Sequence, residues 1–137
     1  MKDLVEIVEY NDEGNAPVID FESWRVARTN YSKQADKENI ITLGRHYLTD
    51  EVFVLLEGKA VLIVASGQDE AKHIHCINIE KIKLYNVKKN VLHALVTAKD
   101  AKLCIVENRN TAIENSQVIK LRDDQIQYIK KEICKLF

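Results

Sequence analysis

The middle of the chain is a dense succession of short β-type segments. Each segment is rich in apolar residues, and polar residues or a glycine separate it from the next. Six follow one another, at residues 51–56, 59–65, 73–79, 84–87, 91–97 and 103–107. Short strands spaced by about 8–12 residues favour a β-sandwich or β-barrel over alternating βαβ units. The sequence therefore predicts an all-β fold.

Residues 61–65 are apolar at every position, so both faces of this strand need cover. A double sheet rolled into a barrel turns one face inward and the other against a second sheet or a second subunit. Because a second subunit is one source of this cover, we expect a homodimer. The first quarter of the chain adds further strands, and the predicted barrel spans about residues 4–118.

The end of the chain follows a different period. Apolar side chains recur at steps of three and four residues, at Ile126, Ile129, Ile133 and Leu136. This spacing predicts one apolar face of a helix over about residues 123–136, and the aspartates at its start suit the helix dipole. We interpret it as a peripheral helix packed on the barrel. With 137 residues, the chain is expected to be a single domain, 1–137.

The composition of the chain narrows the classes of binding partner. There are 20 basic and 21 acidic residues, without a basic cluster, which gives no indication of nucleic-acid binding. The longest apolar run, residues 60–65, is too short to span a membrane. The amino terminus shows no apolar signal segment, and the three cysteines are widely spaced. These features favour a cytoplasmic protein with no nucleic-acid or membrane partner.

The stretch 44–58 carries the strongest indication of a functional site. His46 precedes Glu51 by five residues, and a strand leads from this glutamate to a glycine turn. Alternation along the strand places Glu51, Phe53 and Leu55 on one face. A carboxylate on an otherwise apolar inner face is costly unless it is paired, hydrogen-bonded or bound to a metal. Glu51 is therefore a candidate site residue.

A second stretch, 85–95, carries the other candidate. Residues 88–90 form a predicted turn between apolar runs, and Asn90 tolerates the left-handed backbone that such turns use. His93 follows early in the next strand. It alternates in phase with Val91 and Leu95, which predicts that it faces the same interior.

These stretches resemble the paired motifs of the cupin superfamily. His46, Glu51 and Gly58 stand where the first motif has its second histidine, its glutamate and its closing glycine. His93 stands where the second motif has its histidine. The runs at 49–58, 84–87 and 106–109 further resemble small single-domain bacterial cupins of unassigned function. The resemblance implies a double-stranded β-helix, or jelly-roll barrel, with the C-terminal helix added.

The first motif departs from the cupin pattern at one ligand position. Gly44 replaces its first histidine, so the resemblance leaves three ligands, His46, Glu51 and His93. Two histidines and a carboxylate suit Fe, Mn, Ni or Zn, with open coordination positions. The alternative is a degenerate site in which the same residues form a hydrogen-bonded cluster without metal. In that case His46 or His93 would be the candidate general acid or base, because an imidazole ordinarily titrates near neutral pH.

Other side chains near the motifs are weaker candidates. Tyr47, Tyr85 and Glu107 are expected to line a substrate pocket, although the tyrosines also fit ordinary barrel positions. Arg45 is interpreted as a solvated arginine beside a turn rather than a contact for an anionic substrate. His73 and His75 have a spacing that allows chelation, but exposed strand histidines are commoner than metal sites.

Two functions follow from these observations. The first is an enzyme that acts on a small polar metabolite, such as a sugar-, keto-acid- or ureido-type compound, with a divalent metal at His46, Glu51 and His93. The second is a non-catalytic module that binds or senses a small molecule through a metal-free site. The fold alone does not choose a reaction, and the sequence identifies no catalytic residue.

Overall fold

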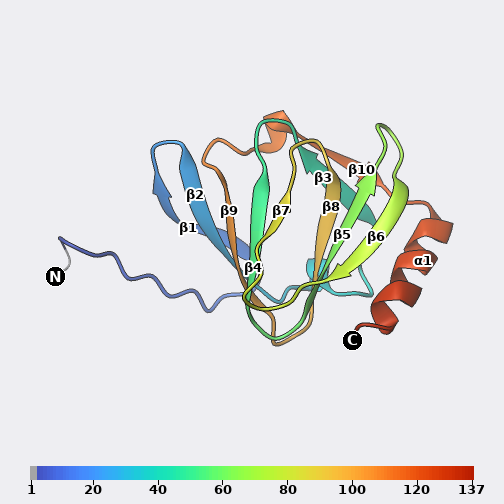
Figure 1. Cartoon of the computed structure of the whole chain (residues 1–137), viewed down its shortest axis with the longest axis horizontal. Helices are drawn as coiled ribbons and strands as arrows, with labels where there is room; N and C mark the ends of the chain where they lie inside the picture. The colour runs from blue at the N-terminus through green and yellow to red at the C-terminus, as the bar shows by residue number, and fades with distance from the viewer. Residues whose placement is uncertain (1–2) are drawn as a thin grey trace.

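Two antiparallel sheets lie face to face in the computed structural model, which describes residues 3–137 (Figure 1). The first sheet has the order β1-β2-β9-β4-β7, and the second has the order β10-β3-β8-β5-β6. The strands of the first sheet are β1 (Asn15–Phe21), β2 (Trp24–Asn30), β9 (Lys102–Asn108), β4 (Glu51–Glu57) and β7 (Tyr85–Val87). Those of the second are β10 (Ser116–Lys120), β3 (Thr42–His46), β8 (Leu92–Thr97), β5 (Ala60–Ser66) and β6 (Lys72–Asn78). The predicted all-β fold is confirmed.

The short connections contain two 3₁₀ turns, η1 (Lys33–Ala35) and η2 (Ile113–Asn115). The first strand begins at Asn15, later than the expected barrel start near residue 4. Leu4, Val5 and Ile7 have local β propensity, but they are exposed and form no strand with the rest of the chain. A strand requires a pairing partner as well as suitable side chains.

Two apolar clusters occupy the two faces of the second sheet. The inner cluster fills the space between the sheets and includes Phe53, Leu62 and Leu103. The outer cluster includes Val61 and Ile63, the neighbours of Leu62 on β5. This arrangement explains why residues 61–65 are apolar throughout, because both faces of β5 are buried.

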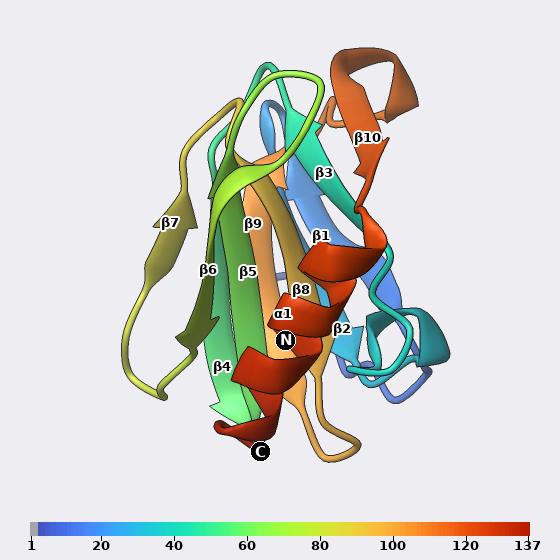
Figure 2. The ribbon, with the colours of Figure 1, turned by 90° about the vertical axis from the view of Figure 1, so that its right-hand side faces the viewer.

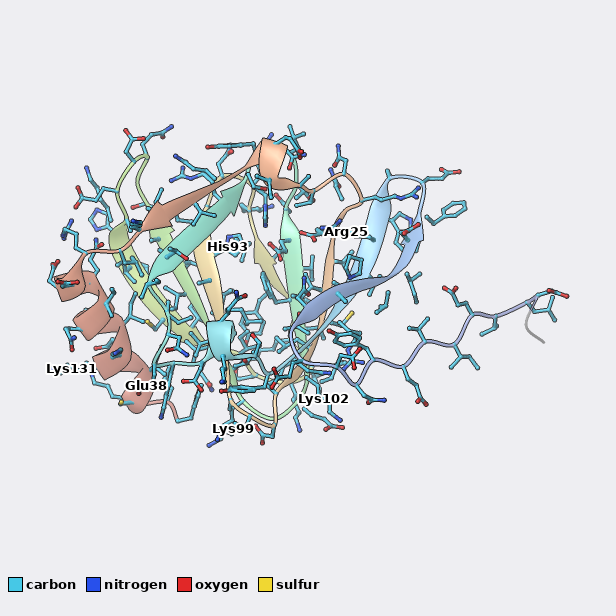
Figure 3. All side chains as sticks on the ribbon, turned by 180° about the vertical axis from the view of Figure 1, so that it is seen from behind. Arg25, Glu38, His93, Lys99, Lys102 and Lys131 are labelled. Carbon is cyan, nitrogen blue, oxygen red and sulfur yellow. The ribbon has the colours of Figure 1, made fainter. Side chains whose placement is uncertain are left out.

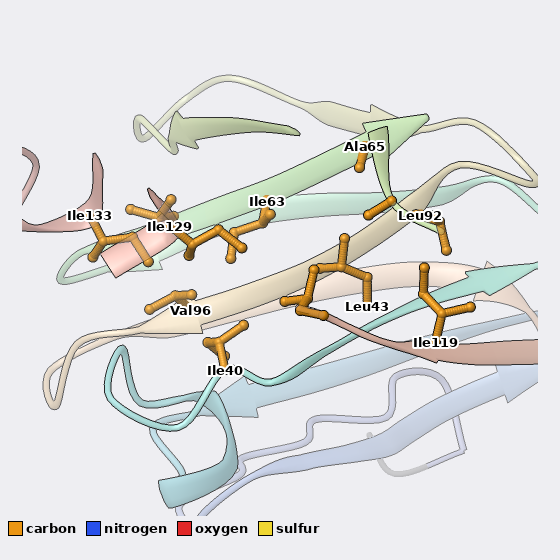
Figure 4. Packing of buried hydrophobic residues seen from close by; sticks show 12 residues of the cluster. Ile40, Leu43, Ile63, Ala65, Leu92, Val96, Ile119, Ile129 and Ile133 are labelled. Atoms are coloured by element: carbon orange, nitrogen blue, oxygen red, sulfur yellow. The ribbon is translucent and has the colours of Figure 1, made fainter. Parts of the chain in front are cut away.

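The helix α1 (Asp123–Cys134) covers the outer face of the second sheet (Figure 2). Ile129 and Ile133 are buried beside Ile63 and Val96, as Figure 4 shows. The sequence predicted that a second sheet or a second subunit covers the outer face of β5. The chain's own helix covers most of that face instead. The expected homodimer no longer follows from this face and stays a prediction.

The start of α1 is fixed by its own side chains and by the sheet. The Arg122 backbone N–H donates to Gln125 Oε1 at 3.0 Å, and Gln125 Nε2 donates to the Ala71 carbonyl at 2.8 Å. Asp123 and Asp124 lie in the first turn, where negative charge favours the helix dipole. Within the described residues, no helix is both long and apolar enough to cross a membrane.

Candidate metal centre

The sheets bring His46, Glu51 and His93 together inside one end of the barrel. His46 is the last residue of β3, Glu51 the first of β4 and His93 the second of β8. The Nε2 atoms of His46 and His93 lie 3.0 Å and 2.9 Å from the same atom, Glu51 Oε2. In Figure 3, His93 is labelled in the space between β3 and β4. The predicted juxtaposition of the three side chains is therefore present in the structure.

Backbone features of the two motifs produce this arrangement. Gly58 has φ +74, and a Cβ atom there would lie 2.5 Å from the Asp100 carbonyl, so the turn after β4 requires glycine. Asn90 has φ +71, and its N–H donates to the His46 carbonyl at 2.8 Å. The predicted left-handed turn thus connects the strand carrying His93 to the end of the strand carrying His46.

The loop before Glu51 is tied to the same turn. Asp50 accepts hydrogen bonds from the Lys89 backbone N–H at 2.9 Å and from Asn86 Nδ2 at 3.0 Å. On the other side, the Asn108 N–H donates to the Thr49 hydroxyl at 3.0 Å. These bonds from β7, β9 and the turn before β8 anchor the segment that connects His46 to Glu51.

Each imidazole is oriented by its second ring nitrogen. His93 Nδ1 lies 3.0 Å from the Val91 carbonyl, and His46 Nδ1 lies 2.8 Å from Ser116 Oγ. Because a carbonyl only accepts, His93 Nδ1 carries hydrogen, and a neutral His93 then has an unprotonated Nε2. That nitrogen and the carboxylate oxygen are both acceptors, so a cation has to lie between them. A proton on Nε2 or a metal ion meets this requirement, and metal-ligating histidines are commonly oriented in this way.

The negative charge of Glu51 and the positive charge of a protonated His93 stabilise each other. Burial alone would raise the pKa of Glu51, but the hydrogen bonds from His46 and His93 lower it to about 2. Burial alone would lower the pKa of His93, whereas the hydrogen bond to Glu51 and the negative charge of that carboxylate raise it above its usual value. Glu107 adds to the same effect. Without metal, Glu51 and His93 therefore form an ion pair.

This ion pair predicts acid sensitivity of the metal-free protein. The folded Glu51 carboxyl binds a proton less tightly than the unfolded one, so its contribution to stability is present above about pH 4.5 and is lost as the pH falls toward 2. We expect a loss of about 2 kcal/mol from this group between pH 6 and pH 3. A carbon-detected NMR titration of the Glu51 carboxyl, together with urea unfolding, measures it. A carboxyl that titrates near 4.5 would contradict the assignment.

The ligand atoms are spaced suitably for a first-row metal. The three atoms lie within 4.8 Å of one another, and within residues 3–137 no other His, Cys, Asp and Glu side chains form such a group. For bonds of about 2.1 Å, neighbouring ligands lie about 3.0 Å apart in octahedral and about 3.4 Å apart in tetrahedral coordination. The two Nε2–Oε2 separations, 2.9 Å and 3.0 Å, lie at or just below the octahedral value, and small outward shifts of the ligand side chains would accommodate the ion. The donor set therefore fits a divalent ion.

Two of the three side chains predicted to line a substrate pocket are tyrosines, and these two occupy different surroundings. Tyr47 is exposed, and its hydroxyl donates to Gln117 Oε1 at 2.9 Å. Tyr85 packs against the inner cluster, and its hydroxyl accepts from the Glu80 N–H at 3.0 Å. Their role in ligand binding stays a prediction.

Glu107 is buried beside the centre on the inner face of β9. The register pairs Val52 with Val106, so Glu51 and Glu107 occupy the next positions on neighbouring strands. Arg25 pairs with Glu107 at 2.7 Å, and Glu107 is not a member of the His–Glu–His group. Glu107 alternates in phase with Leu103 and Ile105 along β9, and all three side chains are buried. Its role in ligand binding stays a prediction.

A cavity of about 380 Å³ opens beside the centre. Glu51, His93 and Phe53 line its base, and the Phe53 ring meets the His93 ring edge-on at 5.9 Å. The uncharged polar side chains among its lining residues are Asn15, Thr29, Ser32, Gln34, Asn39 and Thr42. These residues come from β1, β2, β3 and the segment between β2 and β3, so no local sequence pattern identified them.

The burial of Arg45 contradicts one interpretation made from the sequence. It was expected to be solvated beside a turn, but it is only 4% exposed. Residues 45 and 46 point to opposite faces of β3, so Arg45 lies away from the centre and reaches the hairpin between β5 and β6. His73 and His75 are exposed and take no part in the metal-type group.

No family model matches this sequence, and none of the curated proteins compared with it is a match. Solved structures do match. A cupin-2 domain protein from Shewanella frigidimarina superposes with a TM-score of 0.53 at 17% identity, over 73% of this chain and 85% of that one. Pac13 from Streptomyces, a nucleoside dehydratase, gives 0.59 at 9% identity, over 85% and 87%. CapF from Staphylococcus aureus, a capsular polysaccharide assembling protein, gives 0.57 at 14% identity, over 87% and 33%.

These likenesses establish the fold. The chain has the cupin fold, a double-stranded β-helix, as the two sequence motifs implied. Its candidate site is a His–Glu–His group at one end of the barrel, next to a cavity that polar and apolar side chains line together.

Proposed function

We propose that the protein is a metal-dependent enzyme acting on a small polar metabolite. His46, Glu51 and His93 would hold a divalent Fe, Mn, Ni or Zn ion, and the substrate would bind in the adjoining cavity. One observation carries this proposal. Two Nε2 atoms converge on a single buried carboxylate oxygen at 3.0 Å and 2.9 Å, with both Nδ1 atoms already engaged by protein groups.

A bound metal at such a site supplies Lewis-acid chemistry, because it polarises a carbonyl oxygen or lowers the pKa of bound water. The chain's own residues prepare the site for it. Val91 and Ser116 fix the two imidazoles, and the Phe53 ring restricts the movement of His93. Apolar side chains of the inner cluster, including Phe53 and Ile105, form part of the cavity lining.

The cavity walls favour a neutral ligand with several hydroxyl or carbonyl groups. Among the lining residues that residues 3–137 contribute, Glu51 and His93 are the only ionisable side chains. The remaining polar groups are hydroxyls and amides, which donate to and accept from uncharged oxygen-rich molecules. Structures of the Streptomyces neighbour contain uridine, a ligand of this kind, and uridine is therefore a suitable first probe.

Thr42→Val is expected to weaken binding of a neutral oxygen-rich probe by about tenfold, because it removes one hydroxyl from the cavity wall at nearly constant volume. The measurement is an NMR titration of metal-loaded protein with uridine or ribose. Thr111→Val, outside the cavity, is the matched control. Shifts that avoid the cavity residues, or equal effects of the two variants, would contradict the assignment.

A second candidate function is a metal-free module that binds or senses a small molecule. It is favoured by the Glu51–His93 ion pair, which satisfies the cluster without metal, and by Gly44 at the place of a fourth ligand. Metal analysis of protein purified without chelators separates the two functions. Metal-free protein whose melting temperature is indifferent to added Mn, Fe, Ni or Zn would favour this second function.

A further inference from the structure

A second pocket, of about 520 Å³, lies outside the metal centre. It is bordered by the hairpin between β5 and β6 and by the turn between β7 and β8, which lie at the same end of the molecule in Figure 1. Four basic side chains line it, namely Arg45, His73, His75 and Lys89. No carboxylate is among its lining residues within the part of the chain that is described. The pocket is thus basic on a protein whose net charge is −1.

Arg45 is the unusual member of this group. It is 4% exposed, and its Nη2 donates to the carbonyl oxygens of Gly67 at 2.6 Å and Gln68 at 2.8 Å. Its Nε atom is buried without a hydrogen-bond partner. Between residues 3 and 137, no carboxylate lies within ion-pair distance of its guanidinium.

A buried guanidinium without a counter-charge is energetically costly. Arg25 illustrates the usual solution, because its guanidinium pairs with the buried Glu107 at 2.7 Å. Arg45 has two carbonyl dipoles instead of a negative charge, and it lines a pocket that contains further positive charge. An anion in this pocket would supply the missing partner and leave the two hairpin hydrogen bonds in place.

We propose that this pocket binds a phosphate group, either free or carried by a small metabolite. Arg45 and Lys89 carry charge at neutral pH, and a guanidinium presents several N–H donors in the plane that a phosphate oxygen pair matches. Ser66, Gln68 and Asn90 place additional polar groups on the lining. Two cations, Arg45 and Lys89, in one pocket favour a doubly charged phosphate over a singly charged carboxylate. Val64 and Val91 offer apolar contact for the molecule that carries the phosphate.

None of the three metal-type ligands lines this pocket, but Asn90 and Val91 line it and also contact His46 and His93. Arg45 and His46 are consecutive on β3, and they point to opposite faces of the sheet. Phosphate binding is therefore expected to be independent of Glu51 and of any metal. This separation allows the two sites to be tested apart.

The test uses the full chain, freed of metal by chelation, and titrates it with inorganic phosphate. NMR of the arginine side chains follows the Arg45 Nε–H signal, and calorimetry gives the affinity. We expect saturable binding that shifts this signal. Lys89→Ala should weaken the affinity by about three- to tenfold, as expected for loss of one partly solvated charge. Lys88→Ala is the matched control, since Lys88 lies outside the pocket with its Nζ 3.4 Å from Asp50.

Further titrations identify the ligand and the place where it binds. Glycerol phosphate and inorganic phosphate distinguish a phosphate monoester from the free ion, and tighter binding of either one supports the proposal. Acetate binding as tightly as phosphate would overturn it. So would an Arg45 signal that is unmoved at saturating phosphate, or equal effects of Lys88→Ala and Lys89→Ala. Loss of phosphate binding in Glu51→Gln would assign the anion to the metal centre and likewise overturn the proposal.

Discussion

Replacing His93 by glutamine is expected to reduce the affinity for Zn²⁺ or Mn²⁺ by at least about 100-fold. The change removes one of three ligands, and loss of partners that merely orient a ligand already costs about 10- to 100-fold. Glu51→Gln should have a similar effect, because its Oε2 atom is the point on which both imidazoles converge. Competition with a chromogenic chelator measures the affinities, and circular dichroism establishes that each variant is folded.

His73→Gln is the matched control for this experiment. His73 is also a histidine on a strand of the second sheet, but it is exposed and lies outside the metal-type group. Its replacement should leave the metal affinity unchanged. Equal losses in the His73 and His93 variants, or undiminished binding without His93, would show that the metal binds elsewhere.

Replacing Gly44 by histidine is expected to raise the metal affinity by about tenfold or more. Gly44 pairs directly with His93 across β3 and β8, and it shares the inner face of β3 with His46. A Cβ atom at Gly44 would meet the Gln117 carbonyl at an ordinary 3.5 Å, so the strand accepts a side chain there. The new imidazole would restore the ligand that the first cupin motif has at this position.

Gly44→Ala separates this effect from a change in strand stability. Alanine adds the Cβ atom and reduces backbone freedom, but it provides no ligand. The same chelator competition should show a gain for histidine and none for alanine. If the two variants bind metal equally, position 44 does not face the centre in the way the structure indicates.

The sequence predicted those strands, and the helix, whose buried side chains recur at a regular spacing along the chain. The steps of three and four residues along α1 predicted its buried face, and Ile129 and Ile133 are its most buried apolar side chains. The start of the barrel was less predictable. Leu4 and Val5 have the side chains of a strand, yet strand formation depends on pairing with a distant segment, which local composition does not encode.

The candidate site was likewise predictable where its residues form a local pattern and unpredictable where they depend on distant contacts. His46, Glu51 and His93 were identified because each lies in a motif with a recognisable spacing. Ser116 was missed, because its contact with His46 depends on the pairing of β10 with β3 across 70 positions. The burial of Arg45 was missed for a related reason, since it depends on a hairpin more than twenty residues away. Such contacts arise from the topology of the sheets and leave no local pattern.

Anomalous diffraction from crystals grown with one equivalent of Zn²⁺ or Mn²⁺ tests the central proposal most directly. The account predicts one strong anomalous peak per chain, about 2.0–2.2 Å from Nε2 of His46, Nε2 of His93 and a carboxylate oxygen of Glu51. No peak between these three side chains, or a stronger peak at His73 and His75, would contradict it.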